Sequence, residues 1–577
     1  MTDCRIEAFR ARINNAELFL VLTMMTFPLP SPAKLILSAL ALPCLVAYAQ
    51  QPSVTLDYGT FRGTDSPSTG VKSFLGIRFS DPPTGNLRWR AAVSPPSTNL
   101  GTVNATAFAP ICASIGQTGS GTSEDCLFGN IFVPSGTPSN AKLPIMVWFH
   151  GGGFQSGGTR DFDPRLLIQS SANPIMFVSF AYRLGPLGFL GGAKLKANGQ
   201  VNAGLQDQRV ALRWLQRYAS KFGGDPSKGG FLTDSDHHKM LTSLLSLVTI
   251  WGESAGAGST MFHLLANGGN PEGLFHAAMG DSPSLSFTPS FDSDYIEGIF
   301  NLFSSNAGCG ANANTLACLR SASLSALTNG WNALVANRTS TLFNFSPLFD
   351  GDFIATRPVE GFTSGEFAKV PVLFGSNTNE GAGWSSGLPN PAANTASPNA
   401  NESTVFNFIQ GQWNTFTQGS FNKGLNLYPL SDFGGSFDRQ GQQMYGEARY
   451  ICTAGLITAS ATSARLAAYQ YHYDNPHLGS NHGNDLAAFF PADTPANADA
   501  NDQALFKAMR EFFTSFVTTG KPTSSSSGVT WNAVTDTSND GNPRILFRPA
   551  AIGMEQISQE LNEHCAFWHS INGEMQT

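Results

Sequence analysis

Residues 248–258 combine three local signals in an order that few folds accommodate. Val248–Trp251 is rich in β-branched and aromatic residues, the following Gly-Glu-Ser254-Ala-Gly predicts a sharp turn, and small residues then lead into a helix. The glycines at 252 and 256 let the strand and the helix approach closely, and we expect Ser254 to take a strained backbone conformation that presents its hydroxyl. A strand, a Gly-x-Ser-x-Gly turn and a helix in this order predict a serine nucleophile at the end of a sheet strand.

Nearly continuous apolar runs elsewhere predict strands that are buried on both faces by helices. These runs are Leu143–Phe149, Pro174–Phe180, Val370–Phe374 and Ala467–Tyr473. Leu205–Tyr218 has helical spacing, and Val54–Arg78 alternates apolar and polar residues as antiparallel strands at a sheet edge do. The pattern predicts an α/β class, as one large domain with a mostly parallel central sheet. Two stretches rich in Gly, Pro, Asn and Ser are predicted surface loops, Gly383–Ser403 and Thr518–Ser527.

The N-terminal segment, residues 1–49, is predicted to lie outside this domain. The apolar stretch Leu35–Val46 follows a short basic start and is too short to span a bilayer, and Ala47-Tyr48-Ala49 is a small-x-small cleavage motif. We therefore expect a secretory signal peptide that is cleaved near Ala49, with the mature chain starting at Gln50; an uncleaved signal anchor is the alternative. Because Met25 stands where a conventional signal peptide would begin, the residues before it are either an unusual extension or a misassigned start.

Charge and composition exclude several classes of partner. Residues 50–577 carry 30 Lys and Arg against 38 Asp and Glu, a net charge near −8, so nucleic acid is not an expected partner. No stretch after the leader is long and apolar enough for a membrane span, so no stable membrane anchor is expected. Low charge with abundant Gly and aromatic residues is typical of a globular secreted protein.

Cysteines and glycosylation sequons agree with export. Six cysteines remain after the leader, and an even number in a secreted chain favours three disulfides: Cys112, Cys126, Cys309, Cys318, Cys452 and Cys565. Four Asn-x-Ser/Thr tripeptides predict glycosylation sites: Asn104, Asn337, Asn344 and Asn401.

A serine hydroxyl is a poor nucleophile at neutral pH, so Ser254 needs a base, an acid that orients the base, and donors for the oxyanion. His150-Gly-Gly-Gly-Phe154 lies directly after a predicted buried strand, where consecutive glycines turn N–H groups toward a substrate oxygen. The motif predicts an oxyanion hole, and a flexible Gly-rich turn is the alternative.

With these motifs, the chain resembles the type-B carboxylesterase/lipase family of α/β-hydrolases over essentially all of residues 50–577. Further segments carry the resemblance: Gly76-Ile-Arg-Phe-Ser-Asp-Pro-Pro-Thr-Gly-Asn-Leu-Arg88, Ser123-Glu-Asp-Cys-Leu127, Tyr182-Arg-Leu-Gly-Pro-Leu-Gly-Phe189 and Asn202-Ala-Gly-Leu-Gln-Asp-Gln208. Arg78 is a departure, because the family usually has proline there. The resemblance implies an α/β-hydrolase fold with a large, mostly parallel central sheet.

The family's acid is a glutamate in an Asn-Glu-Gly type of turn, and its histidine lies in a His-Gly turn. Thr378-Asn-Glu380-Gly and Asn481-His482-Gly match these turns. The resemblance therefore implies a catalytic triad of Ser254, Glu380 and His482, in the order of nucleophile, acid and histidine that this topology imposes.

The resemblance implies further roles. The oxyanion donors would be the N–H groups of Gly152, Gly153 and Ala255. The disulfides would be Cys112–Cys126, Cys309–Cys318 and Cys452–Cys565, and the buried ion pairs Arg88–Glu124 and Arg183–Asp207. Glu253 is interpreted as an acid that shapes the site, not as a triad member.

The leading hypothesis is a secreted serine carboxylic-ester hydrolase that acts on small-molecule esters, without cofactor or metal. In lipases of the family the loop between Cys112 and Cys126 carries a long amphipathic lid, but here Ala113–Asp125 is short, polar and free of aromatic residues. We therefore expect a lidless esterase that prefers short-to-medium acyl groups, with a lipase or feruloyl-type esterase as alternatives. A catalytically inert binding ectodomain is the alternative from another class, disfavoured because all three triad positions are filled.

Gly229–Leu247 interrupts an otherwise continuous resemblance. In the family, the segment ending at Lys228 continues directly into Val248. The nineteen residues are either a genuine surface insertion or a translated, unspliced intron, which we favour because they join no recognisable element. His237-His238 within them lacks the carboxylate and histidine neighbours of a metal site.

Overall fold

The computed structural model describes residues 51–114, 121–160, 162–226, 248–310, 312–535 and 543–577. The predicted leader with its cleavage motif at Ala49, and the anomalous segment Gly229–Leu247, lie outside these residues. The chain divides into Met1–Gln50 and Gln51–Thr577, and only the second unit is described below.

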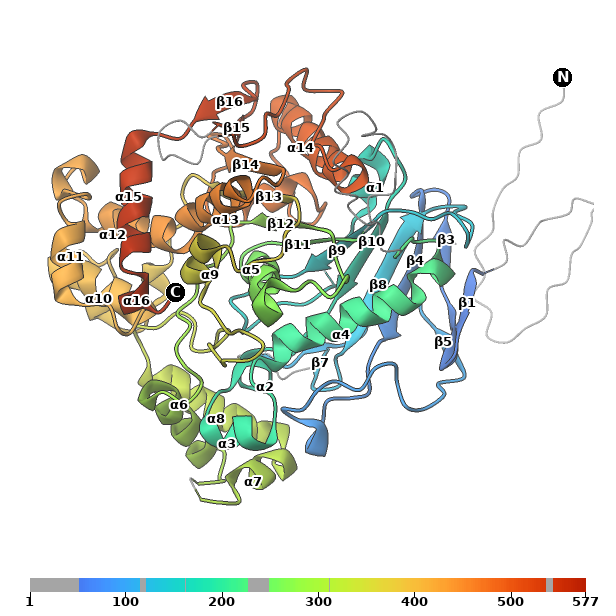
Figure 1. The fold of residues 1–577 in the computed structure, drawn as a ribbon, viewed down its shortest axis with the longest axis horizontal. Coiled ribbons are helices and arrows are strands. Elements are labelled where there is room, and N and C mark those ends of the chain that lie inside the picture. Colours follow the sequence, from blue (N-terminus) through green and yellow to red (C-terminus); the bar gives the residue numbers. More distant parts are fainter. Residues whose placement is uncertain (1–50, 115–120, 161, 227–247, 311, 536–542) are drawn as a thin grey trace, which may run out of the picture. The chain divides into compact units, whose positions relative to one another are not determined.

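Within the described residues, one sheet of eleven strands dominates the fold (Figure 1). In spatial order the strands are β16 (Gly553–Gln556), β15 (Pro543–Phe547), β14 (Ala468–Tyr473), β13 (Val372–Asn377), β12 (Ala277–Asp281), β11 (Val248–Gly252), β9 (Ile145–Phe149), β10 (Met176–Phe180), β8 (Phe128–Pro134), β4 (Val71–Arg78) and β3 (Thr64–Ser66). The strands from β15 to β10 are parallel, and antiparallel pairing is confined to the two edges. The predicted α/β-hydrolase class, with its mostly parallel sheet, is confirmed.

Helices cover both faces of this sheet. One face packs against α4 (Ala203–Tyr218), α5 (Ala255–Gly269), α9 (Pro358–Ser364) and α13 (Cys452–Ser463). The other packs against α1 (Arg165–Ser170) and α14 (Ala500–Thr519). A further apolar cluster joins α10 (Glu402–Gln412), α11 (Gln418–Gly424), α12 (Phe437–Gly446), α15 (Gln559–Ser570) and α16 (Asn572–Met575). The remaining helices are α2 (Gly185–Phe189), α3 (Ala193–Asn198), α6 (Asp294–Asn306), α7 (Thr315–Ser321) and α8 (Leu324–Asn337).

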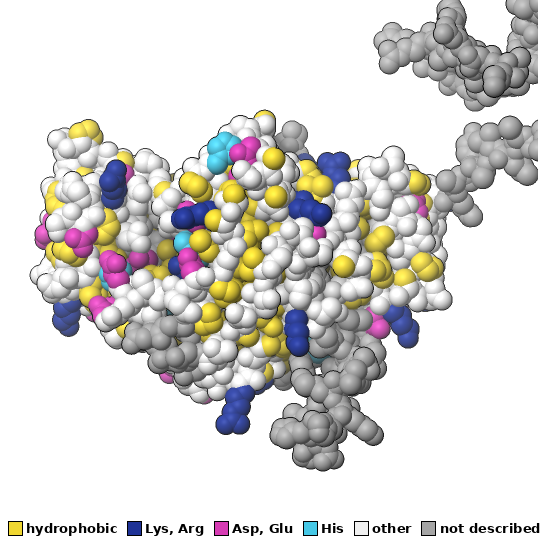
Figure 2. Space-filling view, turned by 90° about the horizontal axis from the view of Figure 1, so that it is seen from above, with side chains coloured by type: hydrophobic (Ala, Val, Ile, Leu, Met, Phe, Trp, Pro, Cys, Tyr) yellow, Lys and Arg dark blue, Asp and Glu magenta, His cyan; other side chains and the backbone are white. Residues whose placement is uncertain are grey.

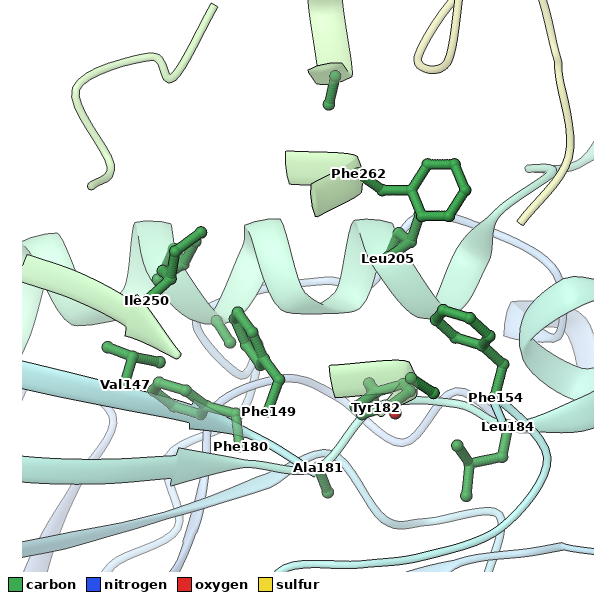
Figure 3. Packing of buried hydrophobic residues seen from close by; sticks show 14 of the residues in the cluster. Val147, Phe149, Phe154, Phe180, Ala181, Tyr182, Leu184, Leu205, Ile250 and Phe262 are labelled. Carbon is green, nitrogen blue, oxygen red and sulfur yellow. The ribbon is translucent and has the colours of Figure 1, made fainter. Parts of the chain in front are cut away.

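The two-residue period of a strand divides the core between the two faces. On β9, Val147 and Phe149 belong to the cluster on the α4 side, whereas Met146 and Trp148 belong to the cluster on the α14 side. Figure 3 shows Val147 and Phe149 close to the helix that carries Leu205. All five residues of β9 are fully buried, which explains why the strand has no polar alternation.

Three predicted strands begin later than the apolar runs suggest. β9, β10 and β13 start at Ile145, Met176 and Val372, after prolines at 144, 174 and 371. Proline has no N–H to donate to a neighbouring strand, so it shortens the ladder at this end.

Two other sequence predictions need correction. Val54–Arg78 does not lie at one sheet edge. β1 (Ser53–Leu56) pairs with β2 (Gly59–Arg62), and β2 pairs with β5 (Thr102–Asn104), in a separate sheet, whereas β3 and β4 join the large one. Another small sheet pairs β6 (Ile111–Cys112) with β7 (Thr122–Ser123). The predicted loop Thr518–Ser527 begins inside α14, and the stretch Gly383–Ser403 contains two 3₁₀ turns and the start of α10.

The exposed surface is largely polar. Among the described residues, Val93 is the one large hydrophobic side chain that is exposed, and in Figure 2 hydrophobic atoms on the visible face are scattered between polar ones. None of the described helices combines the length and the apolar character needed to cross a membrane.

Candidate active site

The turn around Ser254 connects β11 to α5 at the carboxyl edge of the sheet. Ser254 has φ 56° and ψ −119°, a strained conformation for a residue with a side chain. A Cβ atom at Gly256 would lie 2.0 Å from the carbonyl oxygen of Phe149, and one at Gly252 would lie 2.6 Å from the same oxygen. Both positions require glycine because β9 passes so close to the turn.

The structure brings Ser254, His482 and Glu380 into one hydrogen-bonded line. His482 Nε2 lies 2.8 Å from Ser254 Oγ, and His482 Nδ1 lies 2.6 Å from Glu380 Oε2. The three residues come from segments that follow β11, β14 and β13, whose carboxyl ends lie at the same edge of the parallel sheet. Ser254 is only 6% exposed, so its hydroxyl is recessed, and the expectation that the turn would present it openly is wrong.

Two donors that the sequence analysis missed hold the Glu380 carboxylate. Ser282 Oγ donates to Oε1 at 2.5 Å, and the backbone N–H of Asn377 donates to the same oxygen at 2.6 Å. The other carboxylate oxygen is thereby left for His482. A Cβ atom at Gly381 would lie 1.8 Å from the carbonyl oxygen of Gln442, which explains the glycine in the Asn-Glu-Gly turn. Ser282 follows β12 directly, a strand that the sequence analysis did not predict, so no sequence signal pointed to this residue.

Glu253 lies closer to the reaction centre than a general shaping role implies. Its Oε1 is 3.2 Å from His482 Nε2, and burial raises the pKa of Glu253 to about 8. Burial lowers the pKa of His482, but the negative charges of Glu253 and Glu380 outweigh this effect, so the pKa lies above its ordinary value. Glu253 and His482 share one buried site, and the ionised form of each favours the ionised form of the other.

We expect the acidic limb of the kcat/KM profile to move to lower pH in Glu253→Gln. Only a neutral imidazole accepts the proton of Ser254, so activity falls as pH drops through the pKa of His482. Ionised Glu253 is one cause of the raised pKa of His482; in Glu253→Gln this contribution is absent at every pH, so the imidazole stays neutral to lower pH. The control is Glu555→Gln, which changes a carboxylate that pairs with His472 instead. An unchanged limb in Glu253→Gln would contradict the coupling.

The glycine turn after β9 lies against Ser254. A Cβ atom at Gly151 would be 3.1 Å from the Cβ of Ser254, and Gly152 and Gly153 have φ angles of 105° and 62°. Within the described part of the chain, the N–H groups of Gly152, Gly153 and Ala255 donate to no other group. Free N–H groups on a turn that touches the nucleophile are available to a substrate oxygen.

Aromatic rings that the sequence analysis did not single out lie against His482 and against the glycine turn. The ring of Tyr450 is tilted over the imidazole at 4.3 Å, and the ring of Trp384 meets it edge-on at 5.4 Å between centroids. The ring of Phe343 occupies the space beside Gly153, where a Cβ atom would lie 2.1 Å from the nearest ring carbons. Trp384 had a signal, four residues after Glu380, whereas the other two come from distant segments.

The structure contains the disulfides and ion pairs that the resemblance implies. The disulfides join Cys112 to Cys126, Cys309 to Cys318 and Cys452 to Cys565. Two-pronged pairs join Arg88 to Glu124 and Arg183 to Asp207. Arg78, the departure from the family, pairs with Asp125 at 2.5 Å and lies over the Phe128 ring.

The predicted sequons differ in exposure. Asn104, Asn337 and Asn401 are exposed, whereas Asn344 is only 8% exposed. A glycan needs an accessible amide, so the burial of Asn344 argues against its prediction as a glycosylation site.

One further group of side chains has metal-ligand spacing in the described residues: His477, Asp499 and Asp502. Asp499 and Asp502 cap the start of α14, and Asp502 also bonds to His477. These contacts give the group a structural role.

The chain is similar to known proteins both in sequence and in fold. The chain matches the Carboxylesterase family over residues 50–230 and 245–568, and the break between the two stretches falls inside Gly229–Leu247. It is 37% identical to Lipase 4 of Diutina rugosa over 380 residues, which cover 59% of this chain and 64%, less than two thirds, of that protein. It is 31% identical to Secreted lipase 1 of Botryotinia fuckeliana (strain B05.10) over 529 residues, 83% of this chain and 86% of that protein. The solved structure of Aspergillus niger EstA has a TM-score of 0.78 at 29% identity and covers 91% of this chain and 99% of that one.

Proposed function

The chain belongs to the carboxylesterase family and is a carboxylic ester hydrolase, and from this premise we propose that it cleaves esters through an acyl-enzyme formed on Ser254. The observation that carries the proposal is the continuous line from Ser254 Oγ through His482 to Glu380, with both distances at 2.8 Å or less. A nucleophile, a base and an orienting acid within hydrogen-bond reach are what acyl transfer to a serine requires.

The geometry supports the following sequence of steps. His482 accepts the proton of Ser254 as the hydroxyl oxygen attacks the ester carbonyl, and Glu380 stabilises the imidazolium that forms. The imidazolium then donates its proton to the leaving alcohol as the C–O bond breaks. Water attacks the acyl-enzyme with the same base, which releases the acid and restores Ser254.

The oxyanion of each tetrahedral intermediate would be held by N–H groups of Gly152, Gly153 and Ala255. Two observations support this assignment. Gly152 and Gly153 have positive φ angles, and none of the three N–H groups has another acceptor among the described residues. Donors fixed before the reaction cost no reorganisation when charge develops.

For the substrate we propose soluble esters with short-to-medium acyl groups. The disulfide Cys112–Cys126 closes a loop with a sequence separation of 14, and Arg78 pairs with Asp125 near its end. Residues 115–120 of this loop lie outside the described residues, but its length and polar sequence give little apolar surface for a lid. Lipase activity is the second candidate, because two similar proteins are named lipases.

We expect no interfacial activation with tributyrin. A lidless site is open in water, so the rate should follow a simple saturation curve through the solubility limit of the substrate. The measurement is initial rate against tributyrin concentration on both sides of that limit. A sharp rise at emulsion formation would favour the lipase and refute the lidless site.

A fluorophosphonate probe tests the central proposal directly. It should attach covalently to Ser254 and to no other serine, and peptide mass spectrometry locates the adduct. An inert binding ectodomain would remain unlabelled.

We also propose that the protein is secreted after cleavage near Ala49. The three disulfides and the secreted relative support export, because such bonds form in oxidising compartments. N-terminal sequencing of the extracellular protein tests the site, with Gln50 as the expected first residue.

A variant that lacks Gly229–Leu247 should hydrolyse esters at least as fast as the full chain and should be at least as stable. The described flanks favour this outcome: Gly224 pairs with Leu143 and Val248 pairs with Ile145, both at the amino end of β9, whereas Ser254 lies at the opposite edge of the sheet. The short remaining connection therefore has little distance to span. The checks are esterase rate and thermal midpoint, and sequencing of the spliced transcript distinguishes an intron from a genuine insertion. Loss of hydrolysis on deletion would show a role for the segment.

A further inference from the structure

Arg449 is a buried cation without a carboxylate partner. The residue is 3% exposed, and in the part of the chain that the structure describes no Asp or Glu side chain forms an ion pair with it. The comparably buried Arg88 and Arg183 each have a two-pronged carboxylate partner. An unpaired buried charge is costly, so its retention calls for another role.

Aromatic rings surround the guanidinium. Its Cζ lies 4.9 Å from the ring centroid of Phe343, 5.8 Å from that of Tyr450 and 5.9 Å from that of Tyr445. Nη2 donates to Ser286 Oγ at 3.4 Å, and Nε has no hydrogen-bond partner among the described residues. The electron-rich faces of these rings attract the cation in place of a carboxylate.

Two of these rings also touch the proposed catalytic groups. The ring of Phe343 fills the space beside Gly153, and the ring of Tyr450 lies over the His482 imidazole. Trp384 connects the two sides of the site, because its ring contacts the rings of both Phe343 and His482. The Arg449 guanidinium therefore contacts one ring that packs against the glycine turn, Phe343, and another that packs against the His482 imidazole, Tyr450.

The backbone segment that carries Arg449 and Tyr450 also packs against the turn that carries Glu380. Arg449 and Tyr450 lie on the π-helical turn Glu447–Ile451, which follows α12. At the junction, a Cβ atom on Gly446 would be 2.7 Å from the backbone nitrogen of Gly381, so the helix packs directly against the turn that carries Glu380. Single π turns occur frequently at functional sites, where they aim side chains that a regular helix would direct elsewhere.

We propose that Arg449 is a positioning residue: its guanidinium holds the rings of Phe343 and Tyr450 against the glycine turn and the His482 imidazole. It touches no reacting atom and acts through these two rings. The proposal rests on the function proposed above. Small displacements of a base or an oxyanion donor lower the rate of the chemical step more than they lower substrate affinity.

The test compares Arg449→Met and Arg449→Lys with the control Arg357→Met. Methionine keeps an apolar stem without charge, and lysine keeps the charge without the planar group. Arg357 also lies 4.9 Å from an aromatic centroid, that of Phe349, and none of its described contacts reaches the site. Hydrolysis of p-nitrophenyl butyrate gives kcat and KM, and a thermal melt reports stability.

We expect Arg449→Met to lower kcat roughly 10- to 100-fold with KM within about threefold of wild type, and Arg449→Lys to recover part of the loss. Arg357→Met should keep kcat within about twofold of wild type. In a Phe343→Leu background the effect of Arg449→Met on kcat should shrink, because the ring that transmits it is gone. The double-mutant cycle keeps the test decisive if one single variant is poorly stable.

The inference is wrong if Arg449→Met keeps wild-type kcat, if it raises KM alone, or if it and Arg357→Met lose activity equally. Failure of the proposed ester hydrolysis can be told apart from failure of the Arg449 inference. In the first case the wild-type protein itself would neither hydrolyse the ester nor react with the fluorophosphonate at Ser254.

Discussion

Ester hydrolysis by the Ser254→Ala variant is expected to fall by about 10⁴- to 10⁶-fold in kcat. The hydroxyl is the atom that would form the acyl-enzyme, and no other side-chain hydroxyl of the described residues bonds to His482 Nε2. The fold should be nearly unaffected: alanine keeps the backbone turn, and the loss of one hydrogen bond costs about 1 kcal/mol. The measurements are kcat on p-nitrophenyl butyrate and the thermal midpoint of the purified variant.

A matched control is Ser284→Ala. Ser284 lies beside the same turn and is 1% exposed, and its hydroxyl has no hydrogen-bond partner in the part of the chain that the structure describes, so its removal should change kcat by less than about threefold. Undiminished hydrolysis by Ser254→Ala would overturn the assignment of the nucleophile. Equal losses in the two variants would point to disturbed packing around the turn instead.

The second large effect is expected for Glu380→Gln, with kcat lowered by about 10³- to 10⁴-fold. Glu380 Oε1 accepts from Ser282 and from the backbone of Asn377, while Oε2 faces His482 Nδ1. An amide has only one acceptor oxygen, so its NH₂ group must face either these two donors or the imidazole N–H. Either arrangement leaves a buried donor unpaired or turns the imidazole into the wrong tautomer.

Asp281→Asn is the matched control for Glu380→Gln. Asp281 is also fully buried beside the site, but its Oδ2 accepts a hydrogen bond from Trp251 Nε1, and burial holds its pKa well above the usual range, so an amide of the same size can keep the acceptor that Trp251 uses. We expect kcat within about threefold of wild type for this control. Activity of Glu380→Gln close to that of the control would exclude Glu380 as the orienting acid.

The local turns were predictable because their sequences carry their own physical reasons. The glycines beside Ser254 are required by the approach of β9, and Gly381 is required by the approach of α12. The Gly-x-Ser-x-Gly turn with its strand and helix can be recognised from the sequence alone, whereas the Asn-Glu-Gly turn was recognised through the family resemblance. Fully buried strands such as β9 were recognisable from their unbroken apolar runs, although the prolines before them shortened the ladders.

The recess around Ser254 was not predictable in the same way. Ser282, Phe343 and Tyr450 carry no turn signature, and they approach the site from segments far apart in the chain. A serine or a phenylalanine in an apolar context has the same sequence signal whether it lines a site or fills the core. Arg449 gave no signal either, since an arginine is ordinarily expected at the surface.

The sequence by itself determined the α/β class, a mostly parallel central sheet and the turn that carries Ser254, because these depend on local periodicity and on backbone constraints within a few residues. Its resemblance to a known family implied the turns that carry Glu380 and His482. Only the tertiary structure decided how deeply Ser254 lies, that Glu253 reaches His482, and that the Arg449 guanidinium lies against aromatic rings with no carboxylate partner among the described residues. Those features depend on contacts between segments tens to hundreds of residues apart, and on burial, which sets the pKa of each group only once the fold has closed around it.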